Sequence, residues 1–176
     1  MTAVRPLPDH VGPGLRLLMC GLNPSLHAVE AGVGYVTPGN RFWPAMLAAG
    51  LVTRDRDPDH AQRVHRIGMT DLVARATPRA SELTTAEYRA GLVALEVTCA
   101  RERPGAVCFV GLAGWRAAVD RRAVAGVQER TVGGRPVYVM PSTSGLNAAT
   151  PLAVLVEHLR AAAALADAEA LDRSVK

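Results

Sequence analysis

The sequence contains only one lysine, Lys176, which is its last residue. A nucleotide-binding loop of the Walker type needs a lysine beside the phosphates, and a Schiff-base enzyme needs a side-chain amine. A lysine at the last position is a poor candidate for either role, so we expect neither mechanism. The other cationic side chains are arginines, and the net charge is +4. That charge suits a polyanionic partner, although it is also common in proteins that never bind nucleic acid.

Cysteine and histidine are scarce and scattered. Cys20, Cys99 and Cys108 form an odd set without a Cys-x-x-Cys spacing. This argues against a disulfide framework and against a four-thiolate zinc or iron–sulfur site, and it predicts buried free thiols. The five histidines include neither an HExxH motif nor a pair spaced by four residues. We therefore expect no metal.

Long apolar runs are also missing. The apolar residues come in short runs separated by Gly and Pro, far below the roughly 18 consecutive residues that a membrane span needs. Residues 1–14 carry several prolines and charges, and they lack the apolar stretch of a signal peptide. We therefore expect a soluble protein of the bacterial cytoplasm without a membrane partner.

The hydrophobic content of 49% over 176 residues is enough for one substantial core and too little for two independent ones. We predict a single domain over residues 15–171. A flexible segment, residues 1–14, precedes it, and a short tail that frays, residues 172–176, follows it.

Short apolar runs alternate with helical patterns along the chain. This alternation predicts an α/β fold with a mainly parallel central β-sheet and helices on both faces. Such a sheet binds ligands beyond the carboxyl ends of its strands, so the loops that follow the strands are candidates for a shared site. The predicted strands are 15–20, 67–73, 106–110, 128–132 and 136–140, and the last two form a hairpin. The predicted helices are 41–49, 84–103, 113–123 and 150–171. A loop follows the first strand up to about residue 39, and the segment 53–66 is helical at best.

The segment Gly21-Leu22-Asn23-Pro24-Ser25 follows the first predicted strand. It is not a dinucleotide-binding fingerprint, because no GxGxxG accompanies it and Pro24 removes one amide donor. Taken alone, Asn-Pro is ordinary turn chemistry. The local pattern therefore favours a turn, and a functional interpretation needs further motifs.

Further motifs are present in a fixed order. Tyr35 and the block PGNRFW at 38–43 follow GLNPS, and GMTDLV at 68–73 and VYVMPSTSGL at 137–146 come later. Over about residues 15–160 the chain resembles the mismatch-specific uracil/thymine-DNA glycosylases of the uracil-DNA glycosylase superfamily. The resemblance implies a three-layer α/β/α domain that acts as a monomer without a cofactor. It also implies a monofunctional enzyme that flips uracil out of uracil-containing or mismatched duplex DNA, cleaves its glycosidic bond and starts base excision repair.

The resemblance assigns roles in the base pocket to four residues. Asn23 positions the attacking water, and because an amide is not a base at neutral pH we expect slow chemistry. Backbone amides of Leu22 and Tyr35 hold the departing base anion, and the Tyr35 ring stacks on the flipped base. Asn40 supports the base, or it only caps the helix that follows it.

The resemblance also implies a DNA-facing loop after the last strand. Leu146 matches the wedge that fills the space of the flipped base, and Gly145 lets the loop approach the opposite strand. Ser142 and Ser144 bind phosphates, and Asn147 belongs to the same DNA-binding set. The alternative is a Ser/Gly-rich turn between a strand and a helix, which is common.

Two positions depart from the family in ways that matter. Asp71 stands where some relatives carry a neutral or basic residue, and its carboxylate could activate water or stabilise the cationic sugar. A helix-capping or arginine-paired aspartate is an equally good explanation. Ala148 stands where some members have an arginine that reads the widowed guanine, which leaves the preference for a mispaired guanine open.

Two other functions remain open at this point. The first is a non-catalytic DNA-binding protein on the same fold, which keeps the basic surface and the Leu146 wedge without turnover. The second is an unrelated nucleotide-binding α/β protein, in which Tyr35 stacks on a free base. Asn23→Ala separates the first alternative from an enzyme, because only an enzyme loses excision while DNA affinity is kept.

Overall fold

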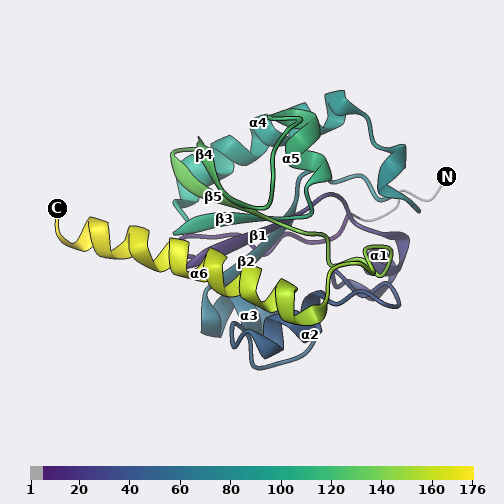
Figure 1. Ribbon diagram of the computed structural model, residues 1–176, viewed down its shortest axis with the longest axis horizontal. Helices are drawn as coiled ribbons and strands as arrows, with labels where there is room; N and C mark the ends of the chain where they lie inside the picture. The colour runs from purple at the N-terminus through teal and green to yellow at the C-terminus, as the bar shows by residue number, and fades with distance from the viewer. Residues whose placement is uncertain (1–5) are drawn as a thin grey trace.

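A computed structural model describes residues 6–176 as a five-stranded sheet between two layers of helices (Figure 1). The strand order is β2-β1-β3-β5-β4, and every neighbouring pair is parallel except β4 and β5, which are antiparallel. The α/β fold with a mainly parallel sheet is therefore confirmed. The strands are β1 (Leu17–Gly21), β2 (Ile67–Asp71), β3 (Ala106–Val110), β4 (Gly126–Val132) and β5 (Arg135–Met140).

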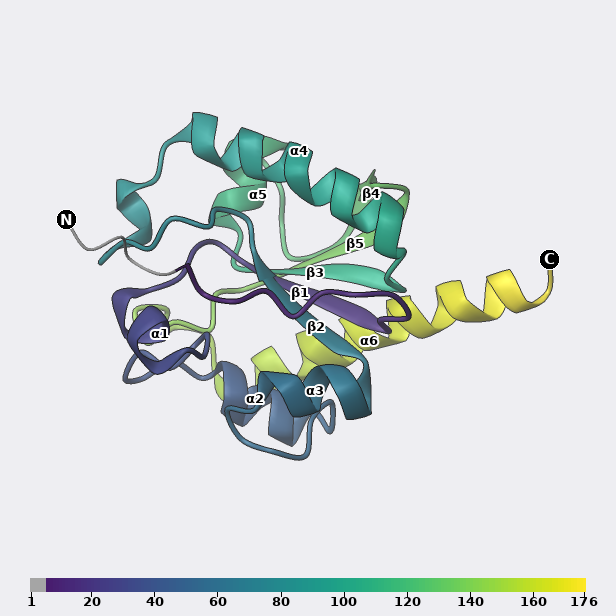
Figure 2. The same ribbon diagram turned by 180° about the vertical axis from the view of Figure 1, so that it is seen from behind.

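The helices form the two outer layers. In Figures 1 and 2, α4 and α5 cover one face of the sheet, and α2, α3 and α6 cover the other. The helix α1 lies at one end of the sheet, and the last turns of α6 extend past the opposite end. The helices are α1 (Leu26–Ala31), α2 (Phe42–Ala48), α3 (Pro58–His65), α4 (Thr85–Glu102), α5 (Ala113–Ala118) and α6 (Leu152–Ser174), with a 3₁₀ turn, η1, at Ala80–Glu82.

The central strand β1 shows why the strands appear as continuous apolar runs. Leu17 and Met19 point into the core cluster shared with α2 and α6, whereas Leu18 and Cys20 point into the cluster shared with α4 and α5. All of its residues are buried. Because helices cover both faces of a parallel sheet, an alternating pattern is not needed there.

Two local sequence patterns form the structures that they predict. Thr84 caps α4, since its hydroxyl accepts from the Glu87 N–H at 3.2 Å and the Glu87 carboxylate accepts from the Thr84 N–H at 2.8 Å. Gly133 and Gly134 join β4 to β5 with φ of 55° and 76°, values that favour glycine in a two-residue hairpin turn. Both predictions are confirmed.

Other boundaries differ from the prediction. The helix α1 lies inside the segment predicted as a loop, where the Ser25 hydroxyl accepts from the Ala28 N–H at 3.1 Å and caps it. The helix α5 ends at Ala118 rather than at residue 123. Just beyond it, the Asp120 carboxylate accepts from the Arg122 N–H, which stabilises a turn in competition with the helix.

The two predicted terminal segments contain ordered contacts. Residues 1–5 lie outside the described residues, but His10 exchanges two backbone hydrogen bonds with Met69, at 2.8 and 3.0 Å. The helix α6 continues to Ser174, so most of the predicted tail, residues 172–176, is helical. Flexibility of residues 1–14 stays a prediction.

The described residues also bear on the earlier inferences about thiols, metals and membranes. Cys20, Cys99 and Cys108 are buried and unpaired, as predicted. No group of three His, Cys, Asp or Glu side chains within residues 6–176 is arranged to hold a metal ion. Among the helices described, none combines the length and the apolar character required to cross a membrane.

Candidate active site

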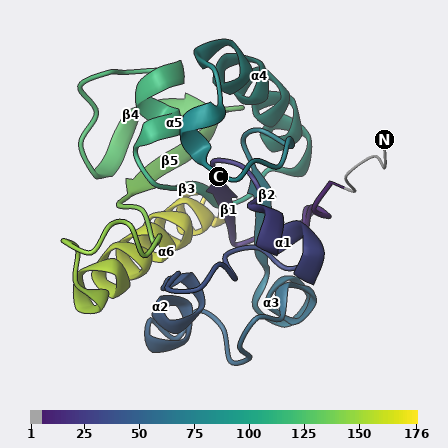
Figure 3. The same cartoon turned by 90° about the vertical axis from the view of Figure 1, so that its right-hand side faces the viewer.

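A cleft of about 570 Å³ opens at the carboxyl ends of the parallel strands. Figure 3 views the molecule from this end, with α1 toward the viewer. The loops after β1, β2 and β5 and the end of β3 supply its lining, as expected for a sheet of this kind. The predicted site residues that line it are Leu22, Asn23, Tyr35, Asn40, Asp71, Ser142, Ser144, Gly145 and Leu146, and only Asn147 does not.

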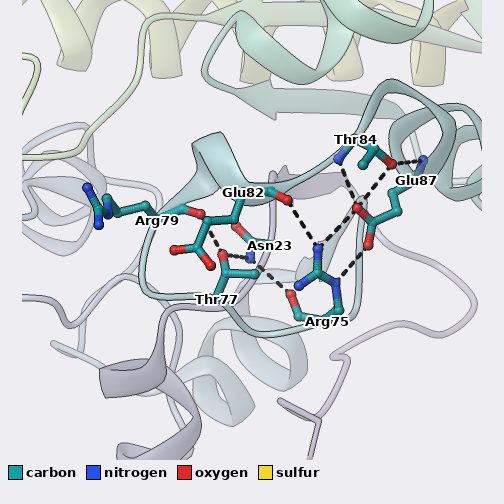
Figure 4. Close-up of polar contacts among 7 residues, drawn as sticks. All are labelled: Asn23, Arg75, Thr77, Arg79, Glu82, Thr84 and Glu87. Atoms are coloured by element: carbon teal, nitrogen blue, oxygen red, sulfur yellow. Dashed lines mark hydrogen bonds and ion pairs between the residues drawn. The ribbon is translucent and has the colours of Figure 1, made fainter.

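The side-chain amide of Asn23 is held in one orientation. Its Nδ2 donates to the Arg75 carbonyl oxygen at 2.9 Å and to Thr77 Oγ1 at 2.7 Å, while Thr77 Oγ1 donates to the Arg79 carbonyl (Figure 4). A carbonyl oxygen only accepts, so the amide cannot be flipped without losing this bond. Asn23 Oδ1 makes no hydrogen bond with another described residue. It is therefore left to accept from a ligand in the cleft.

The acceptors of Asn23 are themselves braced against the start of α4. The Arg75 guanidinium donates to both carboxylate oxygens of Glu87, at 2.7 and 3.1 Å, and to the Glu82 carbonyl (Figure 4). The bond from Arg75 and that from the Thr84 N–H lower the pKa of Glu87 to about 2. The same carboxylate thus caps a helix and fixes the chain that holds Asn23. Sequence reasoning had not identified this function of Glu87.

The Tyr35 ring lies on Phe42, with 3.8 Å between ring centroids and 13° between planes. Phe42 is fully buried and supports one face of the Tyr35 ring, and Tyr35 also lines the cleft. Tyr35 has φ of 63°, a left-handed conformation that is uncommon for a side chain of this size. Its hydroxyl is buried and has no hydrogen-bond partner among the described residues.

Asn40 contacts the start of α2 through the oxygen of its side-chain amide. Its Oδ1 accepts from the Phe42 N–H at the start of α2 and from the Thr143 hydroxyl, both at 2.9 Å. Because the Phe42 N–H can only donate, the oxygen of the amide must face it. The amide nitrogen makes no hydrogen bond within the described chain, and the residue lines the cleft. This nitrogen can therefore donate to a carbonyl oxygen of a ligand in the cleft.

Asp71 ends β2 and lines the cleft beside Tyr35. It makes no hydrogen bond or ion pair with another described residue, so it neither caps a helix nor pairs with an arginine. Burial, followed by the negative charge of Asp9, raises the pKa of Asp71 to about 7. A Cβ at Gly21 would overlap both the Asp71 carboxylate and the Tyr35 hydroxyl. Glycine at that position leaves room for both polar groups against the end of β1.

The loop of residues 141–151 carries an outward-pointing leucine. The hydroxyls of Ser142 and Ser144 accept from the N–H groups of Ser144 and Leu146, each at 3.2 Å, and so they tighten the turn. Leu146 is 97% exposed at its tip. A Cβ at Gly145 would lie 3.2 Å from the Gly39 carbonyl oxygen, so this loop packs closely on the loop of Asn40.

Asn147 holds the loop together through its side chain. Its amide nitrogen donates to the Ser142 carbonyl at 2.8 Å and to Thr150 Oγ1 at 3.0 Å, which closes the loop on itself. Arg41 holds the loop from outside, because its guanidinium donates to the carbonyls of Asn147 and Thr150. No pattern in the sequence indicates this role of Arg41, since its acceptors are backbone groups far along the chain. A DNA contact by the Asn147 side chain stays a prediction.

Two residues that line the cleft have backbone N–H groups without a hydrogen-bond partner among the described residues. The N–H groups of Leu22 and Tyr35, which the sequence assigned to the base anion, make no hydrogen bond within the part of the chain that the structure describes. Oriented amides of this kind stabilise developing negative charge. His27 is exposed on α1 and does not line the cleft.

The chain matches a known protein family. The family model of the uracil DNA glycosylase superfamily matches residues 8–163. The matched region contains all of the cleft-lining residues discussed above, and it spans most of the chain. The match is at the level of the superfamily and does not single out the mismatch-specific family within it.

Proposed function

Since the chain belongs to the uracil DNA glycosylase superfamily, we propose that it removes uracil from DNA by hydrolysing the N-glycosidic bond and leaves an abasic site. Membership of the superfamily by itself supports a DNA glycosylase of base excision repair, and the choice of uracil is the finer part of the proposal. The observation that carries it is the fixed Asn23 amide, whose oxygen is unpaired in a cleft that also contains a base platform and an exposed leucine.

Hydrolysis of this bond passes through a sugar with oxocarbenium character and a base that leaves as an anion. Asn23 Oδ1 accepts a hydrogen bond from the attacking water and holds it below the anomeric carbon. The backbone N–H groups of Leu22 and Tyr35 stabilise charge on the base. The Asp71 carboxylate, when ionised, stabilises the cationic sugar or takes the proton of the water.

The enzyme is monofunctional in this proposal. Cleavage of the DNA strand by β-elimination usually begins with an amine that forms a Schiff base with the sugar. The only lysine of the chain is Lys176, and it is not among the residues that line the cleft. The strand therefore stays intact after the base has left.

DNA binding is proposed for the surface around Leu146. Reaching a base inside a duplex requires that the base be flipped, and a wedge reduces the cost of unstacking. The hydroxyl protons of Ser142 and Ser144 are not used in hydrogen bonds within the described residues, so both can donate to phosphate oxygens.

One excision assay tests the proposed function. We expect the purified protein to release uracil from DNA that contains uracil opposite guanine, and to leave an abasic strand that breaks only after treatment with alkali. Uracil opposite adenine, uracil in single strands and thymine opposite guanine, tested in parallel, define the substrate range. Absence of release from every uracil substrate would refute the removal of uracil, and breaks before alkali treatment would refute a monofunctional enzyme.

Leu146→Ala should slow excision from duplex DNA by about tenfold, because the space of the flipped base is no longer filled. Excision from single-stranded DNA should change little, since no stacked partner has to be replaced. The measurement is the single-turnover rate on both substrates. Leu171→Ala, at an exposed leucine near the end of α6, is the matched control. Equal slowing on both substrates would contradict the wedge role.

A further inference from the structure

A second, small cavity adjoins the cleft. It has a volume of about 20 Å³, and Tyr35 and Asp71 line both hollows. The polar residues on its other side are Asp9, His10 and Thr70. None of these three was assigned a role from the sequence, and Asp9 lies in the segment that was expected to be flexible.

Asp9 contacts the end of β2 through its side chain and through the backbone of its neighbour. Its Oδ1 accepts from the Thr70 hydroxyl at 2.8 Å. The next residue, His10, exchanges two backbone hydrogen bonds with Met69, and its ring contacts the Asp59 carboxylate at 3.0 Å. The segment therefore lies along the end of β2 and brings the Asp9 carboxylate to the cavity.

Three polar groups around this cavity lack partners among the described residues. They are the Tyr35 hydroxyl, which is buried, the carboxylate of the partly buried Asp71, and Oδ2 of Asp9, which is an exposed residue. Buried polar groups are nearly always hydrogen-bonded, and a space of this size is sufficient for one water molecule. A single water, which forms two to four hydrogen bonds, can satisfy all three groups.

We propose that Asp9 is a positioning residue for Asp71, acting through one water molecule that fills this cavity and also binds the Tyr35 hydroxyl. The inference rests on the proposed function, in which the ionised Asp71 carboxylate assists hydrolysis. Asp9 does not touch the substrate. It acts on Asp71 by orientation and by charge, because two nearby carboxylates disfavour each other's ionisation.

The direction of the charge effect follows from the groups that face Asp71. These are Asp9 and His10 from the N-terminal segment, Tyr35 from the loop before α2, and Cys20 from β1. Burial is the main cause of the raised pKa of Asp71, and the charge of Asp9 is the second. Removing the Asp9 charge should lower the pKa of Asp71, so that it ionises at a lower pH.

The test is Asp9→Asn, measured as the single-turnover rate of uracil excision against pH. The acidic limb of the profile should move to lower pH by about 0.5 unit. The variant should thus be about two- to threefold faster than the wild type near pH 6 and equal to it near pH 9. Asp9→Glu keeps the charge and should restore the wild-type profile. Asp59→Asn, which removes a neighbouring carboxylate that does not line the cavity, should leave the limb in place.

The possible failures can be told apart. If Asp71→Asn abolishes the limb while Asp9→Asn leaves it unmoved, this inference is wrong and the role of Asp71 stands. If Asp71→Asn keeps the limb, the role of Asp71 fails as well. Thermal unfolding and DNA affinity check folding, and Asp9→Ser replaces Asp9→Asn if the latter does not fold. A high-resolution crystal structure should show one water molecule bound to the carboxylates of Asp9 and Asp71. An empty cavity would overturn the proposal that a water molecule links them.

Discussion

Asn23→Ala should reduce the single-turnover rate of uracil excision by at least about 100-fold, because the oxygen that positions the attacking water is lost. DNA affinity should stay close to that of the wild type, since the Leu146 loop is untouched. Excision by product analysis and binding by fluorescence anisotropy are the two measurements. A protein that binds DNA but never excises, even as the wild type, would instead be the non-catalytic alternative.

A second variant separates the position of the Asn23 amide from its presence. Thr77→Val removes one of the two acceptors of Asn23 Nδ2 and keeps the side-chain volume similar. The amide is then held by the Arg75 carbonyl alone and is positioned less tightly, so we expect a smaller fall in rate, about tenfold, with an unchanged pH profile. Full activity of Asn23→Ala would remove Asn23 from the mechanism. Full activity of Thr77→Val would mean only that the amide needs no support.

Asp71→Asn should lower the maximal rate by about tenfold or more and should remove the acidic limb of the pH profile. The direction of the pH dependence follows from the pKa of Asp71, which is about 7. Below this pH Asp71 is protonated and cannot act as a base, so the wild-type rate should fall as pH decreases through 7. A carboxamide has no such titration, and the variant should be insensitive to pH in that range. Single-turnover rates across this range provide the measurement.

Asp71→Asn should lower the rate of excision but raise the stability of the fold at neutral and alkaline pH. The pKa of Asp71 is raised above its unfolded value, so the folded state binds more protons than the unfolded state at intermediate pH. Stability is therefore lost as pH rises toward 7, and the loss is complete above it. Asp71→Asn should melt at a higher temperature than the wild type near pH 8, and this advantage should shrink near pH 5. A lower melting temperature near pH 8 would contradict the burial of this charge.

The local elements could be predicted because their signals lie within a few residues of each other. The Thr84 and Glu87 capping box, the Gly133-Gly134 hairpin and the buried strand 17–21 each depend on neighbours in the sequence. The helix α1 was missed because its six residues carry no clear periodicity, and only the Ser25 hydroxyl marks its start. The end of α5 was overestimated because the turn at Asp120 competes with the helix.

By itself, the sequence determined the α/β fold and the end of the sheet at which a site could form, and its motifs marked many of the residues that line the cleft. The tertiary structure alone decided how those residues are held and which groups surround them. It fixed the Asn23 amide through the Arg75 carbonyl and Thr77, and it placed Asp71 next to Asp9 rather than next to an arginine. The reason is physical: orientation and charge in a site depend on groups that are distant along the chain, and no local pattern encodes which of them become neighbours.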